Sequence, residues 1–363
     1  MNQTGDGEEG RCASWCASPA AGTPNLDEVK YSEVKRAHIV PRCYLLNFAV
    51  DETVSLRVDG KVIPGPTSID DAAVRKTFYR RYRPDGTPID DVEWSLSQVE
   101  SVVGPMLPLI GESWPCGTIE DKGKLAEFFA FQLVRGPRWK RWREAETRRQ
   151  VAKQRHNPEP VLHNGIWLPV SQKDLNEVED HLLSETQWLT RMMSIANKLI
   201  DIFGSMRWHL IEFEEPLLAI SDQPVVGWPL KEEFRPPGPN QAGVGALNFL
   251  EVRVPISPTL AVLMTWEDAQ DAAEPMPGTA EIAANINAFT IGNADRQWMH
   301  KPGAAPPIAT GYLDPISPML IEGYGPTAAE ASKVRDAVAE NVQPRLGETF
   351  SKTAEIISVT ARG

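Results

Sequence analysis

The segment of residues 119–135 limits the possible folds more than any other part of this chain. Its spacing predicts a helix that is apolar nearly all round and carries Phe128 and Phe129 among its large side chains. Such a helix must lie at the centre of a domain, because no face of it suits water. Gly136 and Pro137 end the helix. The fold therefore needs other elements packed around this helix.

The composition is that of an ordinary globular protein. The chain has 363 residues, of which 42 % are apolar and 24 % are charged, and this excludes collagen-like, coiled-coil and wholly disordered chains. No window reaches the roughly 18 consecutive apolar residues of a membrane helix, so we expect no membrane partner. The net charge of −12 argues against a surface built throughout for nucleic acid, and leaves room for a local basic patch.

The cysteines do not form a disulfide framework. Cys12 and Cys16 lie in residues 1–25, where the Gly, Ser, Ala and Pro content predicts a disordered leader without the apolar core of a secretory signal. Together with Cys43 and His38 they have the residue types of a zinc site; the alternative is a set of reduced thiols. We expect reduced thiols and a cytoplasmic protein.

Three kinds of periodicity follow one another along the chain. Short apolar stretches come first, with hairpin turns at residues 59–60 and 85–86. Helical spacing begins at residue 91, passes through a strongly basic segment and ends in one long helix over 171–203. Strand-like alternation returns after residue 204. A long Pro- and Gly-rich loop is predicted at 231–245. Two further helices are predicted at 279–291 and 327–341.

This order of strands, helices and strands is typical of an α+β fold, with a helical layer packed on a mainly antiparallel sheet. We predict one α+β domain over residues 26–350, with two packed lobes that meet near residue 205 as the alternative. A C-terminal tail over residues 351–363 completes the predicted organisation.

Several blocks of the sequence, taken in order, carry a family resemblance. They are AHIVPRCYLLNFA, TFYR, VEWSLSQVE, FFAFQLVRGPR, AISDQPVV and NINAFTIGNADR. In these blocks the chain resembles the domain of unknown function 4238, a bacterial-rich family, over nearly the whole folded part. It departs at Cys43, where a bulky residue is more usual. The resemblance implies a shared fold and a shared site, and it brings no established activity.

Two glutamates on the helix that begins near residue 91 are candidate catalytic residues. Glu93 and Glu100 are seven residues apart, about two turns and roughly 10.5 Å, so both emerge on the same face. Two such carboxylates can hold a divalent cation or divide the roles of acid and base. The alternative is a pair of solvated glutamates on an amphipathic helix.

Gln132 and Arg135 lie one turn apart in the apolar segment of residues 119–135. A guanidinium does not lose its proton in proteins, so a buried one needs an anion beside it. The candidates are Glu93 or Glu100, Asp222, and a phosphate or carboxylate ligand gripped by Arg135. The alternative is a purely structural ion pair.

Three further polar residues lie next to apolar segments. Asp222 follows a short buried run and precedes Gln223-Pro224, where sites collect but where Ser-Asp-x-Pro also forms a capped turn. His38 is a candidate base or ligand, or a satisfied core residue. Asn287, on a mainly apolar helix, can orient a substrate or cap a backbone group.

Positive charge is concentrated in two segments. Residues 135–155 hold nine Lys and Arg and two Glu, which gives 9 − 2 = +7. Residues 75–83 mix arginines such as Arg80 with aromatic residues such as Tyr79, a combination suited to phosphate contacts and base stacking. The two segments form an anion-binding surface if they converge. The alternative is that they pair with acids such as Asp90 and Asp91.

The sequence lacks the G-x-S-x-G, P-loop and H-E-x-x-H motifs. We predict a hydrolase, nuclease-like, that acts on an anionic phosphodiester or nucleotide substrate, with a divalent cation as its expected type of cofactor. The alternatives are a non-enzymatic nucleic-acid or nucleotide sensor, and a buried polar network in a protein that acts through protein partners. The predicted catalytic residues are His38, Glu93, Glu100 and Asp222, and the predicted substrate-binding residues are Gln132, Arg135, Arg138, Asn287, Arg80 and Tyr79.

Overall fold

The computed structural model describes residues 36–309, with gaps at 84, 115–116, 157–160, 164–165, 169–170, 230–248 and 267–270. The predictions for the leader, the Pro- and Gly-rich loop, the last helix and the tail lie outside the described residues. Cys12 and Cys16 lie outside them as well. The domain bounds at 26 and 350 stay a prediction.

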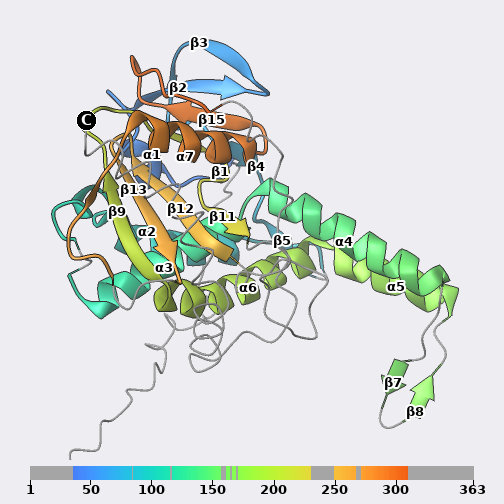
Figure 1. Ribbon diagram of the computed structural model, residues 1–363. Coiled ribbons are helices and arrows are strands. Elements are labelled where there is room, and N and C mark those ends of the chain that lie inside the picture. Colours follow the sequence, from blue (N-terminus) through green and yellow to red (C-terminus); the bar gives the residue numbers. More distant parts are fainter. Residues whose placement is uncertain are drawn as a thin grey trace, which may run out of the picture.

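The described part of the chain is an α+β structure, as the order of elements predicts (Figure 1). A five-stranded sheet has the order β11-β12-β13-β9-β14, and a four-stranded sheet has the order β10-β15-β2-β3. Their neighbours are antiparallel, except that β14 runs parallel to β9. The bounds are β2 Thr53–Val58, β3 Lys61–Ser68, β9 Arg207–Glu212, β10 Ala219–Ser221, β11 Val226–Pro229, β12 Phe249–Ser257, β13 Leu260–Thr265, β14 Met276–Pro277 and β15 Gln297–His300.

Three short antiparallel pairs complete the strands of the described residues. They are β1 with β4, β5 with β6 and β7 with β8. The bounds are β1 Arg36–His38, β4 Val74–Lys76, β5 Arg81–Tyr82, β6 Pro88–Ile89, β7 Val161–His163 and β8 Ile166–Leu168.

The predicted hairpin turn at residues 59–60 is confirmed between β2 and β3. Asp59 and Gly60 both have positive φ, 50° and 77°. This is the backbone twist that two-residue hairpin loops require, and Gly60 adopts it without strain.

The helices agree with the sequence pattern, with one exception. Their bounds are α1 Arg42–Leu46, α2 Asp91–Val103, η1 Leu107–Leu109, α3 Ile119–Val134, α4 Pro137–His156, α5 Gln172–Leu183, α6 Glu185–Ser205 and α7 Ala280–Gly292. The prediction of one long helix over 171–203 is wrong, because the chain breaks at Ser184 into α5 and α6. Ser184 has an extended backbone with ψ 150°, and its hydroxyl accepts a hydrogen bond from the N–H of Gln187. A serine in this role starts a new helix without any proline or glycine.

The break gives the molecule an arm. α4 and α5 lie side by side and project from the body, with the β7–β8 hairpin at the tip (Figure 1). The start of α5 is a capping box in which the Ser171 and Asp174 side chains each accept a hydrogen bond from the other residue's backbone N–H.

The five-stranded sheet is covered on both faces. Trp208 on β9 points toward α3, where its ring lies 5.6 Å from that of Phe129. Ile211, three residues further along β9, points to the opposite face, which α7 covers. α3 packs against α6 beneath the first face, so the expectation that residues 119–135 form a central helix is confirmed.

Among the residues that the structure describes, no helix combines the length and the apolar character that crossing a membrane would require.

Asn287 on α7 is fully buried and holds three chain segments together. Its Oδ1 accepts from the N–H of Ala219 at 2.9 Å, and its Nδ2 donates to the carbonyls of Leu217 and Pro307 at 2.7 and 2.8 Å. These bonds account for the buried amide, so Asn287 is left out of the candidate site below.

We predict that Asn287→Ala lowers the free energy of unfolding by about 2–4 kcal/mol, because it leaves three buried backbone groups without partners. Urea denaturation of the variant measures this. Asn197→Ala, which removes an exposed asparagine from α6, is the matched control and should change stability by less than about 0.5 kcal/mol. Equal effects of the two substitutions would contradict the structural role of Asn287.

Candidate functional site

Arg135 is the centre of the candidate site. It caps the C-terminus of α3 and is only 2 % exposed. Its Nη1 donates to Oε1 of Glu100 at 2.7 Å, its Nη2 donates to the carbonyl oxygen of His38 at 2.7 Å, and its Nε donates to the hydroxyl of Tyr79 at 3.0 Å. The expected anionic partner of Arg135 is therefore Glu100, on α2.

Tyr79 completes the surroundings of this guanidinium. Its hydroxyl donates back to the carbonyl of Arg135 at 3.1 Å, and its ring centroid lies 5.2 Å from the guanidinium carbon. Burial raises the pKa of Tyr79 to about 12, so the phenol stays neutral. Burial lowers the pKa of Arg135, but Tyr79 and Glu100 together raise it above its ordinary value. Arg135 is thus a permanent buried cation.

Glu93 is the second carboxylate on the same face of α2. Burial raises its pKa to about 7, and the charges of Glu100 and Asp90 add to the rise while Arg135 opposes it. Its Oε2 is buried and has no hydrogen-bond partner among the described residues. The carboxyl of Glu93 therefore exchanges its proton near neutral pH, which is the property of a general acid or base.

Gln132 lies one helical turn before Arg135 on α3 and is 1 % exposed. Neither its Nε2 nor its Oε1 has a partner within the described part of the chain. Buried amides are almost always hydrogen-bonded, so an unpaired one needs an explanation. A bound molecule or water that both accepts and donates would satisfy it.

His38 contributes its backbone to this cluster and its ring to another contact. The ring Nε2 lies 3.3 Å from the carbonyl oxygen of Ile69, to which it donates. Burial lowers the pKa of His38 below its ordinary value, while Glu100 raises it. His38 thus joins the Arg135 contacts through its backbone carbonyl, while its ring is bonded to the backbone of Ile69.

Asp222 lies apart from the Arg135 contacts. Its Oδ1 accepts from the N–H of Asp295 at 2.7 Å, and its Oδ2 accepts from those of Arg296 and Gln297, each at 3.0 Å. Burial raises the pKa of Asp222 to about 6, against these donors and nearby arginines, so the carboxylate is charged at neutral pH. It anchors the start of β15, and we leave it out of the proposed site.

The segments of Asp222 and Arg135 nevertheless touch. A Cβ added at Gly136 would lie 1.2 Å from Nε2 of Gln223. No side chain fits in that space, so glycine is required for Gln223 to approach the end of α3 so closely.

Two arginines of the basic segment at residues 75–83, Arg80 and Arg81, pair with acids. Arg80 donates to both oxygens of Asp90, at 3.1 and 3.3 Å, and Arg81 pairs with Asp91. Arg138 donates to the carbonyl of Gly292 at 2.9 Å. For Arg80 and Arg81 the structure therefore agrees with the alternative prediction, pairing with Asp90 and Asp91. These two arginines do not form an anion-binding surface with α4.

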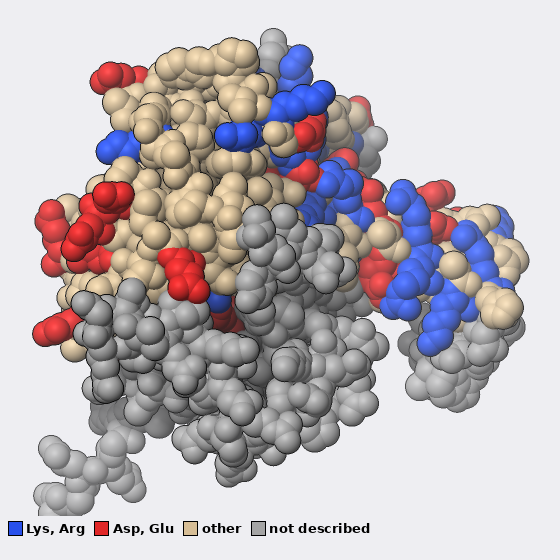
Figure 2. Space-filling view, turned by 45° about the horizontal axis from the view of Figure 1, so that its top comes forward, with Lys and Arg blue, Asp and Glu red and all other residues tan. Residues whose placement is uncertain are grey.

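A different basic surface lies on the arm. Four cationic side chains of α4 are exposed and share one broad face of the helix, which we call the α4 stripe: Arg141, Arg148, Arg149 and Lys153. Figure 2 shows Lys and Arg side chains gathered on this arm. Arg141 pairs with the buried carboxylate of Asp295. The pairs of Arg148 with Glu144 and of Arg149 with Glu146 are exposed on the arginine side, and such pairs are weak.

The described residues contain no group of three or more His, Cys, Asp or Glu side chains placed to hold a metal ion. Glu93 and Glu100 share a face, but Asp222 does not join them. Cys43 is a free thiol, and burial raises its pKa to about 11.

The sequence did not point to one polar group, formed by Glu251, Arg253 and Asn285, which lines a cavity under α7. A signal was present in EVRVPIS, where Glu251 and Arg253 fall on the same face of a strand whose other face is apolar. Asn285, the partner of Arg253 on α7, could not be predicted from any local sequence pattern.

One family model matches residues 36–304 of the chain, and its description is "Protein of unknown function (DUF4238)". No curated protein and no solved structure matches the sequence.

The raised pKa of Glu93 predicts a pH dependence of stability. Between pH 4.5 and about 7 the folded protein keeps the Glu93 proton and the unfolded chain releases it, so stability falls as pH rises through this window. Glu93→Gln removes this loss, and should make the protein more stable than the wild type at pH 8 by about 1–3 kcal/mol but not at pH 4.5.

Urea denaturation at the two pH values measures this difference. The matched control is Glu120→Gln, which changes an exposed glutamate in the first turn of α3. It should follow the wild type at both pH values. If Glu93→Gln also follows the wild type at both pH values, folding does not raise the pKa of Glu93.

Proposed function

Because this chain belongs to DUF4238, a family of proteins of unknown function, we propose a function from the site itself. The proposal is a hydrolase that acts on an anionic substrate, a phosphodiester or nucleotide, in the cytoplasm. Glu93 is its general base. The free thiol of Cys43 is compatible with a cytoplasmic location.

One observation carries the proposal. Glu93 combines a pKa of about 7 with a buried oxygen that has no partner among the described residues. A base whose pKa lies near the working pH is deprotonated often enough to accept a proton from water and basic enough to hold it. An ordinary surface glutamate, with a pKa near 4.3, is about 500-fold weaker as a base than this.

The residues around Glu93 have distinct roles in this proposal. The Glu100–Arg135–Tyr79 network is a positioning network, because Arg135 is buried and its contacts are to protein groups. Gln132 offers an amide oxygen and an amide nitrogen to a polar group of the substrate. Glu93 accepts a proton from a water molecule whose oxygen bonds to the phosphorus of the substrate. The P–O bond to the leaving group breaks, the leaving group keeps the bonding electron pair, and the proton held by Glu93 passes to it.

The α4 stripe supports an anionic substrate. α4 begins at Pro137, two residues after Arg135, and the stripe begins one turn further on, at Arg141, which pairs with Asp295. The helix carries eight Lys and Arg and two Glu, which gives 8 − 2 = +6. A phosphodiester chain that lies along α4 would be held by contacts that do not depend on its sequence.

We predict that the purified protein hydrolyses single-stranded DNA or RNA, assayed with and without magnesium or manganese, and that the rate rises with pH around an apparent pKa near 7. Glu93→Gln should lower the rate roughly 100-fold or more and remove this pH dependence. Gel assays of labelled oligonucleotides over pH 5–9 measure both effects.

Glu120→Gln is again the control and should keep the wild-type rate and pH profile. Glu100→Gln tests positioning. It should lower the rate and shift the apparent pKa of the remaining activity, because Glu100 contributes to the pKa of Glu93. The absence of cleavage under all these conditions would contradict the proposal that this protein is a hydrolase.

The same α4 stripe favours a second candidate function, a sensor or accessory protein that binds nucleic acid without chemistry. Its exposed cations span residues 141–153 and so about 18 Å of helix, which matches several phosphates of an extended strand. In this case binding occurs and Glu93→Gln changes nothing.

For either candidate, Arg148→Ala with Lys153→Ala should weaken the binding of a fluorescent single-stranded oligonucleotide and reduce the slope of log K against log salt by about 1.4, since each phosphate contact contributes about 0.7. Fluorescence anisotropy between 50 and 200 mM NaCl measures this. Lys173→Ala removes an exposed lysine from α5 and is the control. A slope unchanged by the double substitution excludes the stripe as the binding surface.

A further inference from the structure

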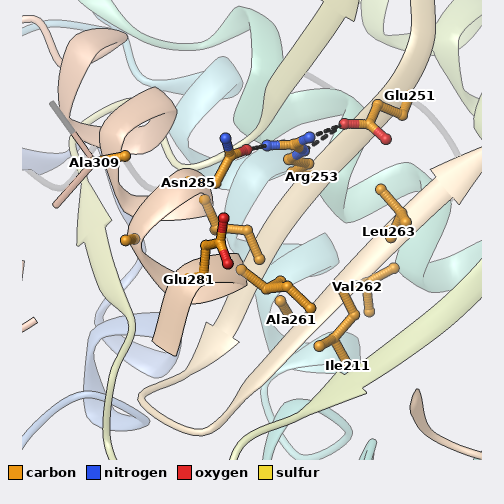
Figure 3. A pocket seen from close by; sticks show the side chains of 12 residues that line it. Ile211, Glu251, Arg253, Ala261, Val262, Leu263, Glu281, Asn285 and Ala309 are labelled. Carbon is orange, nitrogen blue, oxygen red and sulfur yellow. Dashed lines mark hydrogen bonds and ion pairs between the residues drawn. The ribbon is translucent and has the colours of Figure 1, made fainter. Parts of the chain in front are cut away.

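A cavity of about 270 Å³ lies between α7 and the five-stranded sheet (Figure 3). Strand register shows which side of the sheet it occupies. Ile211 pairs with Ala261, and both line the cavity, whereas Trp208 faces α3. The sheet therefore separates this cavity from the Glu93 site.

The floor and one wall of the cavity are apolar. Ile211, Ala261 and Leu263 come from the sheet, and Ile282 and Ile286 come from α7. The hollow has room for about nine water molecules at liquid density, at roughly 30 Å³ each. A small molecule with an apolar body gains free energy by leaving water for such a surface.

The opposite wall holds an ordered polar group. Nε of Arg253 donates to Oε1 of Glu251 at 2.5 Å, and Nη1 donates to Oδ1 of Asn285 (Figure 3). The guanidinium carbon lies 5.2 Å from the centroid of the Phe289 ring. The Arg253 and Glu251 side chains are only 11 % and 8 % exposed, so this wall is rigid and largely dry.

The charges on the lining decide which ligand fits. The positive charge of Arg253 is already matched by Glu251. The remaining charge is the carboxylate of Glu281, in the first turn of α7, for which the described residues supply no cationic partner. The lining thus has one unmatched negative charge, and an anionic ligand would meet both this charge and a neutralised arginine.

We propose that this cavity is a binding site for a small amphipathic amine, with its apolar body on the Ile211–Ala261 floor and its ammonium group toward Glu281. The amide Nδ2 of Asn285 is a further polar group at this wall. The site is independent of the proposed hydrolase, because it lies across the sheet from Glu93.

The test uses three probes of similar size on the full chain at pH 7.5: 2-phenylethylamine, 2-phenylethanol and phenylacetate. Isothermal titration and thermal shift measure binding. The amine should raise the melting temperature saturably and bind about fivefold more tightly than the alcohol, and phenylacetate should bind weakest. Glu281→Gln should reduce the preference for the amine by about twofold to fivefold, the effect of a partly exposed charge.

Ala284→Leu fills the cavity from α7 and should abolish binding of the amine and the alcohol. Ala145→Leu places the same substitution on the exposed face of α4 and should leave binding unchanged. Circular dichroism establishes that both variants fold. The proposal is overturned if the wild type shows no saturable binding of the amine up to about 10 mM, if phenylacetate binds as tightly as the amine, or if Ala284→Leu binds the amine as the wild type does.

Discussion

The buried charge of Arg135 organises the part of the molecule where chemistry is proposed. A guanidinium cannot shed its proton, so its removal from water must be offset by several good contacts. The structure supplies one from each of three segments: the carbonyl of His38, the hydroxyl of Tyr79 and the carboxylate of Glu100. β1, the residues before β5 and the middle of α2 are thereby fixed around the end of α3.

The condition of Glu93 follows from this arrangement. Two carboxylates share the neighbourhood of one guanidinium, and Glu100 takes the direct contact at 2.7 Å. Glu93 is left half-buried, with the charges of Glu100 and Asp90 nearby and no ion pair of its own with any described residue, and its pKa rises to about 7. Burial above all, and the neighbouring carboxylates after it, thus give Glu93 the raised pKa on which the proposed function rests.

Sequence reasoning was successful where a single segment decides the outcome. The apolar character of residues 119–135 makes α3 central, and the presence of Arg135 there requires an anion, whichever residue supplies it. The start of α5 at Ser171 is also local, since a capping box needs only the residues of one turn. The break at Ser184 was missed, because a serine inside a continuous apolar stripe reads equally well as a solvent-facing helix position.

The rest depends on residues that are distant in sequence. Glu100 rather than Glu93 or Asp222 meets Arg135, and this follows from how α2 crosses α3. Asp222 looks like a site residue at a strand end, but its three donors come from residues more than seventy positions later. No local pattern contains that information. The side of β12 that carries Glu251 and Arg253 is predictable from alternation, whereas the hollow beside them forms only when α7 is laid across the sheet.

The net charge of −12 does not represent the local charge of the arm. α4 has 20 residues and so is about 30 Å long, while the electrostatic screening length is about 8 Å at physiological salt. Acids on the body therefore have little effect on the outer part of the α4 stripe. The acids that pair with the stripe are Glu144 and Glu146 of α4 itself, beside Arg148 and Arg149. At the inner end Arg141 pairs with Asp295, and on α5 Glu179 pairs with Arg155 where the two helices meet. A chain that is acidic overall thus still presents one cationic edge, along the outward face of α4.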